Sequence, residues 1–158
     1  MLNKKIKALN NLLAEIEQNI PLKDKTNLKV KKSDIGWQLD HSLKVFTAVC
    51  EWTIKSNPKD YEWKFSFWRT LLFPLGYIPR GKVKAPKIVQ PPNIILDKDL
   101  HEQLQTAKTN VNTLKSLPKT AYFKGLLIKN IFFLISVTTK NIIIRVSKIS
   151  KISIILDA

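Results

Sequence analysis

Apolar residues near the start of the chain recur at the spacing of a helix. They repeat every three or four residues, which places them in one stripe along one side of a helix. The stripe consists of Leu2, Ile6, Leu9, Leu13, Ile16 and Ile20. Because proline has no backbone N–H, Pro21 predicts the end of this first helix. The lysine-rich residues 21–32 have no such period and indicate a loop.

A second helix is predicted over residues 34–56. Ser33 is placed to cap it, and Asp34 in its first turn is favourable for the helix dipole. With residues placed 100° apart, the apolar positions fall on two nearly opposite faces. One face holds Ile35, Leu39, Leu43, Phe46 and Cys50, and the other holds Trp37, His41, Val45, Ala48 and Trp52. We therefore expect this helix to be covered on both sides, with His41 in an apolar environment.

Prolines divide the middle of the chain. Asn57 and Pro58 end the second helix, and the alternating aromatic residues of 61–68 fit either a strand or a helix. The prolines and glycines of residues 74–92 predict an extended basic loop without regular structure. Asp97 is expected to cap a further helix, which Pro118 ends. The apolar stripe of that helix is Leu100, Leu104, Ala107, Val111 and Leu114.

The last stretch, residues 121–158, differs in character. It has many isoleucines, no histidine and a single acidic residue, Asp157. Apolar and polar residues alternate from Arg145 onward, which indicates a strand, whereas a helical bundle needs a helix here. Lys140, Asn141 and Arg145 interrupt the apolar sequence, so a membrane span of about 20 residues is not predicted.

Composition sets further limits. A chain of 158 residues with 44% apolar residues can form one domain with one core. The single cysteine, Cys50, excludes an internal disulfide framework and a cysteine-rich zinc site, and we interpret it as a small buried residue. The N-terminal residues lack an uninterrupted apolar signal segment, so we expect a cytoplasmic protein.

The net charge of +15 invites a nucleic-acid interpretation. Nearly all of the positive charge is lysine, and the three arginines, which alone can grip a phosphate with two parallel hydrogen bonds, lie far apart in the chain. Lysine, asparagine and isoleucine are also what an A+T-rich genome encodes. We therefore do not expect nucleic acid as the main partner.

A basic module for nucleic acid or acidic partners, using the loop from Arg80 to Lys87, is an alternative function. Membrane attachment through residues 128–151 is another, and a homodimer stays open.

Two sequence segments point to a family. Residues 35–45, IGWQLDHSLKV, are followed by FPLGYIPRGK at 73–82 and by Ala85-Pro86. This pattern resembles an uncharacterised bacterial branch of the DinB-like superfamily over about residues 1–123. The resemblance implies an all-α, up-and-down four-helix bundle with a divalent metal, zinc or nickel. In such proteins one histidine of the second helix and two histidines of an H-x-x-x-H or H-x-x-H-H element on the last helix hold the metal.

The resemblance assigns His41 to the ligand position on the second helix. Trp37, on the same helix face, and Arg80 and Lys82 of the basic loop are the pocket or ligand contacts that we expect. The last helix should supply companion histidines, but this sequence has none there. His41 is therefore either a remaining metal ligand or a hydrogen-bonded structural histidine, and His101 is expected to face solvent.

These observations predict an incomplete member of a metal-dependent enzyme family, with the metal absent or weakly held. In an intact relative, the metal would activate a bound thiol or water. The aromatic residues Trp63, Phe65, Phe67 and Trp68 are expected to cover the second helix rather than to stack on nucleic-acid bases. We divide the chain into a bundle region, residues 1–123, and an atypical segment, residues 124–158. A frameshift near residues 123–134 would explain that segment, and the coding DNA tests this hypothesis.

Overall fold

The computed structural model describes residues 2–26, 33–62, 87–123 and 126–156. The four long helices are α1 (Leu2–Asn19), α2 (Ile35–Ile54), α4 (Asp97–Ser116) and α5 (Ile128–Leu156). Among the described residues, three short 3-10 helices lie in the connections: η1 (Ile20–Leu22), η2 (Pro58–Asp60) and η3 (Lys87–Val89). The two-residue strands β1 (Tyr122–Phe123) and β2 (Leu126–Leu127) pair antiparallel between α4 and α5.

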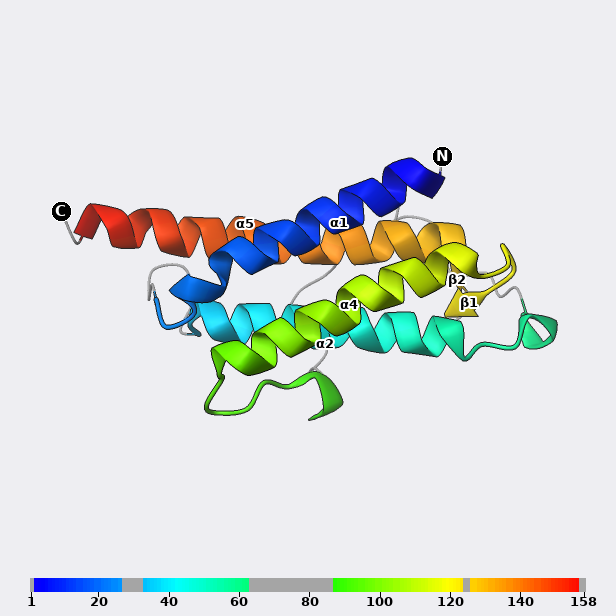
Figure 1. The fold of residues 1–158 in the computed structure, drawn as a ribbon, viewed down its shortest axis with the longest axis horizontal. Helices are drawn as coiled ribbons and strands as arrows, with labels where there is room; N and C mark the ends of the chain where they lie inside the picture. The colour runs from blue at the N-terminus through cyan, green and yellow to red at the C-terminus, as the bar shows by residue number, and fades with distance from the viewer. Residues whose placement is uncertain (1, 27–32, 63–86, 124–125, 157–158) are drawn as a thin grey trace.

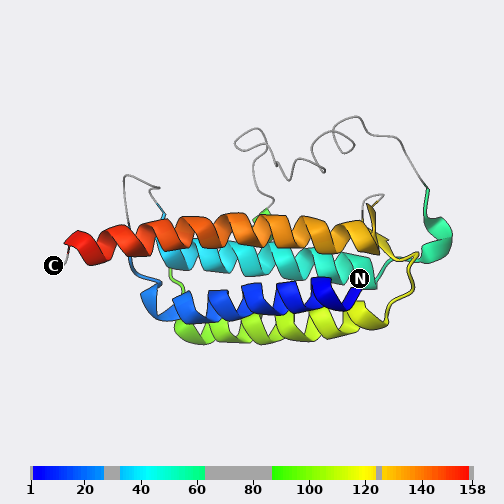
Figure 2. The ribbon, with the colours of Figure 1, turned by 90° about the horizontal axis from the view of Figure 1, so that it is seen from above.

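The long helices form an all-α four-helix bundle, which confirms the predicted fold class (Figure 1). Both α1 and α2 pack against α4 and α5, so α1 and α2 occupy opposite corners of the bundle. In Figures 1 and 2, α1 and α5 run in one direction and α2 and α4 in the other. The consecutive helices α2 and α4 therefore run parallel, which the long connection between them allows, so the bundle departs from the predicted up-and-down order, in which consecutive helices alternate in direction.

The predicted apolar stripes form the core. Each stripe is buried because its three- and four-residue spacing keeps it on the side of the helix that faces the bundle axis. Buried residues of α1, α2 and α4 in this core are Ile6, Leu9, Leu13, Ile16, Ile35, Leu39, Leu43, Phe46, Cys50, Leu100, Leu104, Ala107, Val111 and Leu114. Ile20 of η1 is buried with them, and Pro21 lies at the start of this turn, as its missing N–H favours.

The connector after η1 holds the N-terminus of α2. The backbone N–H of Ile35 donates to the carbonyl of Lys25 at 3.0 Å, and that of Gly36 donates to the carbonyl of Lys23 at 2.7 Å. A Cβ atom at Gly36 would lie 3.2 Å from the Lys23 oxygen, so this close approach favours glycine. Part of the predicted loop therefore satisfies N–H groups that a helix start leaves without partners.

Two helix caps differ from the prediction. Asp34, not Ser33, caps α2: its Oδ1 accepts from the backbone N–H of Trp37 at 2.6 Å, because Asp34 has the extended backbone that a cap requires. Asp97 is the first residue of α4 rather than its cap, and the extended residue before it is Leu96, which makes no side-chain cap bond. The carboxylates of Asp97 and Asp99 instead lie in the first turn, where the helix dipole favours them.

The strand prediction for the last segment is wrong. Residues from Arg145 onward belong to the long helix α5, which packs against α1 and α2. The reason is a second pattern in the same residues, with apolar positions three, four or seven apart that face the core. The buried residues Ile131, Ile135, Ile142, Val146 and Ile149 form this stripe. Packing of that stripe outweighs the strand preference of the β-branched residues.

The outer face of α2 is only partly covered, contrary to the prediction. Trp37, His41, Val45 and Ala48 are half-buried, and Trp52 is 67% exposed. The turn η3 packs against this face, so the segment that we expected to lack regular structure contains one 3-10 turn. The expected aromatic cover, Trp63 to Trp68, lies outside the described residues. Within the described chain, no helix is both long and apolar enough to cross a membrane.

Candidate functional site

His41 is fixed between α2 and η3. Its Nδ1 lies 2.7 Å from the carbonyl oxygen of Val89. Because a carbonyl can only accept, Nδ1 must carry the proton and donate, and a neutral ring then has its lone pair on Nε2. Trp37, one turn earlier in α2, stacks on the ring with centroids 5.1 Å apart and an interplanar angle of 22°. The surroundings of His41 are therefore only partly apolar: Trp37 is an aromatic neighbour, and the Val89 carbonyl is a polar one.

A buried ion pair lies next to His41. Asp40 has a side chain that is only 2% exposed, and its Oδ1 lies 2.7 Å from the Nζ of Lys44, one turn further along α2. Its Oδ2 accepts a 2.7 Å hydrogen bond from Nε2 of Gln103 on α4. Lys44 also donates to the carbonyl of Gln90, at 3.4 Å. These contacts connect α2, α4 and the residue after η3 around one carboxylate.

A groove of about 480 Å³ opens beside this ion pair, between α2, η3 and α4. It is lined by Lys44, Thr47, Ala48, Ile88, Asp99, Glu102, Gln103 and Thr106. Among the described residues, the buried Oγ1 of Thr47 and Oε1 of Gln103 have no hydrogen-bond partner. Buried polar atoms are normally paired, so these two unpaired atoms, both on residues that line the groove, are exceptions.

The predicted ligand residues do not come together into a metal site. Among the described residues, no group of three His, Cys, Asp or Glu side chains is placed to hold a metal ion. His101 is exposed, as expected, and its Nδ1 lies 2.8 Å from the Asp97 carbonyl of its own helix. Arg80 and Lys82, the two predicted contacts in the basic loop, lie outside the described residues.

Sequence reasoning identified His41 and Trp37 but missed Asp40, Lys44 and Gln103. The spacing of Asp40 and Lys44 could have indicated their ion pair, because an aspartate and a lysine four residues apart on a helix form a favourable pair. Nothing in the sequence indicated Gln103, which is 63 residues away from Asp40.

Cys50 is completely buried in the core, which confirms its interpretation as a structural residue. Burial, with a smaller contribution from the charge of Glu51, raises the pKa of the thiol from 9.0 to about 12. The thiolate is therefore strongly disfavoured in the folded protein at neutral pH.

This pKa predicts alkaline destabilisation. Above pH 9 the unfolded chain loses the thiol proton while the folded chain keeps it, so the free energy of unfolding falls until the folded thiol ionises near pH 12. The slope is at most about 1.4 kcal/mol per pH unit. Urea unfolding of wild type and Cys50→Ala at several pH values between 8 and 11 isolates this effect, since other titrating groups cancel. Cys50→Ala is less stable at pH 8, and the difference should shrink as pH rises. A constant difference would contradict the prediction.

Comparisons with known proteins find no matching family model, no similar curated protein and no similar solved structure.

Proposed function

We propose that this chain is a DinB-like bundle protein with an incomplete metal site. One observation carries the proposal: His41 has the hydrogen bonding of a metal-binding histidine but has no companion histidine. Ligating histidines commonly donate their second ring N–H to a carbonyl, which orients the ring, and the bond from Nδ1 of His41 to Val89 has this form. Nε2 is then the nitrogen that would face a metal.

The composition supports the incomplete site. The chain has two histidines, so three imidazoles cannot meet in one molecule. The second histidine, His101, is exposed on α4 and bonds to its own helix. Asp40, the acidic residue next to His41, is already held by Lys44 and Gln103. A tight zinc or nickel site needs several converging ligands, and one imidazole does not provide it.

Calorimetric titration with zinc and with nickel tests the proposal. We expect the wild type to show only a weak heat and no saturable one-to-one binding at micromolar metal. The variant His41→Gln should give the same weak heat. His101→Gln is the matched control, because it removes an exposed imidazole that bonds to the Asp97 carbonyl of its own helix. Release of protons, followed in buffers of different ionisation enthalpy, is a second readout, since a ligating group gives up its proton. One metal equivalent bound tightly by the wild type, and lost in His41→Gln but not in His101→Gln, would refute the proposal.

A further inference from the structure

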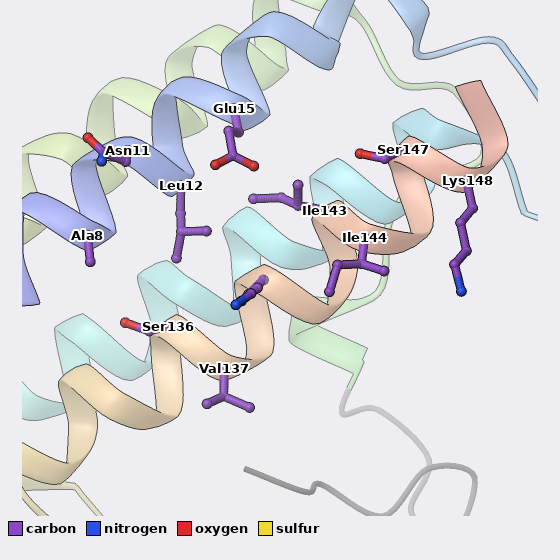
Figure 3. A pocket seen from close by; sticks show the side chains of 11 residues that line it. Ala8, Asn11, Leu12, Glu15, Ser136, Val137, Ile143, Ile144, Ser147 and Lys148 are labelled. Carbon is purple, nitrogen blue, oxygen red and sulfur yellow. The ribbon is translucent and has the colours of Figure 1, made fainter. Parts of the chain in front are cut away.

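A second groove, separate from the His41 site, runs between α1 and α5 (Figure 3). It measures about 660 Å³. Leu12 of α1 and Ile143 of α5 line it and are partly or almost wholly buried, so they form an apolar floor. Asn11 and Glu15 lie on the α1 rim, and Ala8, Ser136, Val137 and Ser147 complete the lining with the α5 residues described next. The groove shares no residue with the His41 site.

Charged and apolar side chains alternate along the α5 rim of the groove. Lys140, Ile144 and Lys148 follow one another at intervals of four residues, which places them in one row along the helix. Ile144 is 43% exposed, and both lysines are exposed. In Figure 3, Ile144 and Lys148 project from the outer side of α5 while Leu12 projects from α1 toward α5. The backbone positions of Lys140 and Lys148 stand about 12 Å apart along the helix axis, at 1.5 Å per residue.

Charge argues against a second copy of this chain in the groove. In a two-fold symmetric pair whose α5 helices cross antiparallel at Ile144, Lys140 of one copy would lie opposite Lys148 of the other. Like charges at such short range are destabilising, and each copy carries a net charge of +15. We expect the occupant instead to supply negative charges opposite the two lysines of the α5 rim, and none opposite the exposed Glu15 of the α1 rim.

We propose that the α1–α5 groove binds an acidic amphipathic helix of another protein. An apolar residue of this helix lies over Ile144, and acidic residues four positions before and after it pair with Lys140 and Lys148. Because this pattern is symmetric, it fits in either direction. The groove follows α5 from Ser136 to Lys148, about 18 Å, which is the length of a 12-residue helix. Laying an apolar helix face into a groove between two helices is a common recognition mode.

Two lipid occupants fit less well. A single acyl chain carries one anionic head group and would match only one of the two lysines. A bilayer surface is flat and would not reach the floor formed by Leu12 and Ile143. The groove proposal is independent of the proposed function, because the metal titration tests His41 on α2, whereas the groove lies between α1 and α5.

A designed peptide tests the proposal by fluorescence anisotropy. The labelled probe is about 16 residues long, so that it forms a helix, and has leucines at spacings of three and four on one face. Two glutamates, eight residues apart, flank the central leucine, and a twin peptide has lysines in their place. We expect the full-length protein to bind the glutamate peptide, more weakly as salt rises, and not to bind the lysine peptide.

Charge-reversal variants locate the binding. Lys140→Glu with Lys148→Glu should weaken binding about tenfold, the effect of losing two exposed ion pairs. Lys115→Glu with Lys119→Glu makes the same change of net charge at two exposed positions, one in the last turn of α4 and one just after it, and should leave the affinity unchanged. Equal loss in both double variants, equal binding of both peptides, or no binding of the glutamate peptide would overturn the proposal. Two further results would overturn the proposal. One is a dimer seen by light scattering that the variant Ile144→Asp abolishes, and the other is flotation with phosphatidylserine vesicles that the same variant abolishes.

Discussion

Ile149→Asp is expected to unfold the protein, whereas Ile144→Asp, in the same helix, is expected to leave it folded. Ile149 is completely buried in the core, while Ile144 is 43% exposed. Burying a carboxyl group without a partner costs several kcal/mol, and losing the isoleucine side chain removes a further stabilisation of about 1.5–3 kcal/mol. The whole bundle is expected to be stable by only about 5–15 kcal/mol. Circular dichroism during heating measures the outcome.

The conservative variant Ile149→Val separates polarity from volume. It removes one methylene group and should cost about 0.5–1.5 kcal/mol, which lowers the melting temperature by a few degrees. If Ile149→Asp instead melted cooperatively near the wild-type temperature, α5 would not be part of the core. Residues 124–158 would then be an appendage to a bundle formed by the rest of the chain.

The sequence predicted three of the four long helices because each has a long apolar stripe with a clear end. In α1 and α4 the stripe stops at a proline, so the period and the end agree. In α5 two patterns compete: isoleucines, serines and lysines alternate over the last turns, while the buried stripe repeats from Ile131 to Ile149. The longer pattern prevails, because α1 and α2 cover the stripe along its length.

The same stripe bears on the frameshift hypothesis. Translation in the wrong frame gives no reason for apolar residues to recur at helical spacing over several turns. The regular stripe from Ile131 to Ile149 therefore favours an in-frame origin for this segment. The coding DNA from Lys119 onward tests the hypothesis, because a histidine element in another frame would support it.

Cap positions and the polar site depended on contacts that local sequence does not contain. Ser33 and Asp34 are both good capping residues, and Asp34 is the cap because its backbone is extended and its Oδ1 accepts from the N–H of Trp37. In the site, helical periodicity placed His41 on an apolar face of the second helix, and resemblance alone gave it the role of a ligand. Its Val89 partner and the Gln103 partner of Asp40 come from distant segments that packing brings together.

Lys44→Met is expected to have the second-largest effect on stability. The change keeps the aliphatic stem and removes the ammonium group, which leaves the buried carboxylate of Asp40 with Gln103 as its remaining partner. Breaking a fully buried ion pair costs about 3–5 kcal/mol. Since the Lys44 side chain is 27% exposed, water screens part of the charge, and we expect a loss of about 2–3 kcal/mol. Urea unfolding measures this loss.

A matched control is available on α4. Lys98 and Glu102 also form a lysine–acid pair four residues apart, at 3.7 Å, but both side chains are exposed. Lys98→Met should therefore cost no more than about 0.5 kcal/mol. Equal losses in Lys44→Met and Lys98→Met would show that burial of Asp40 gives its ion pair no special importance.

The variant Asp40→Asn completes a double-mutant cycle with Lys44→Met. Asparagine still accepts the hydrogen bond from Gln103 through its side-chain oxygen, but it has no charge for Lys44 to compensate. Lys44→Met should then cost much less in the Asp40→Asn background than in the wild type, because no uncompensated carboxylate remains. If the cost were the same in both backgrounds, the lysine would stabilise the bundle through its stem alone. The groove beside it would then be held open by packing, and not by the Asp40–Lys44 ion pair within α2.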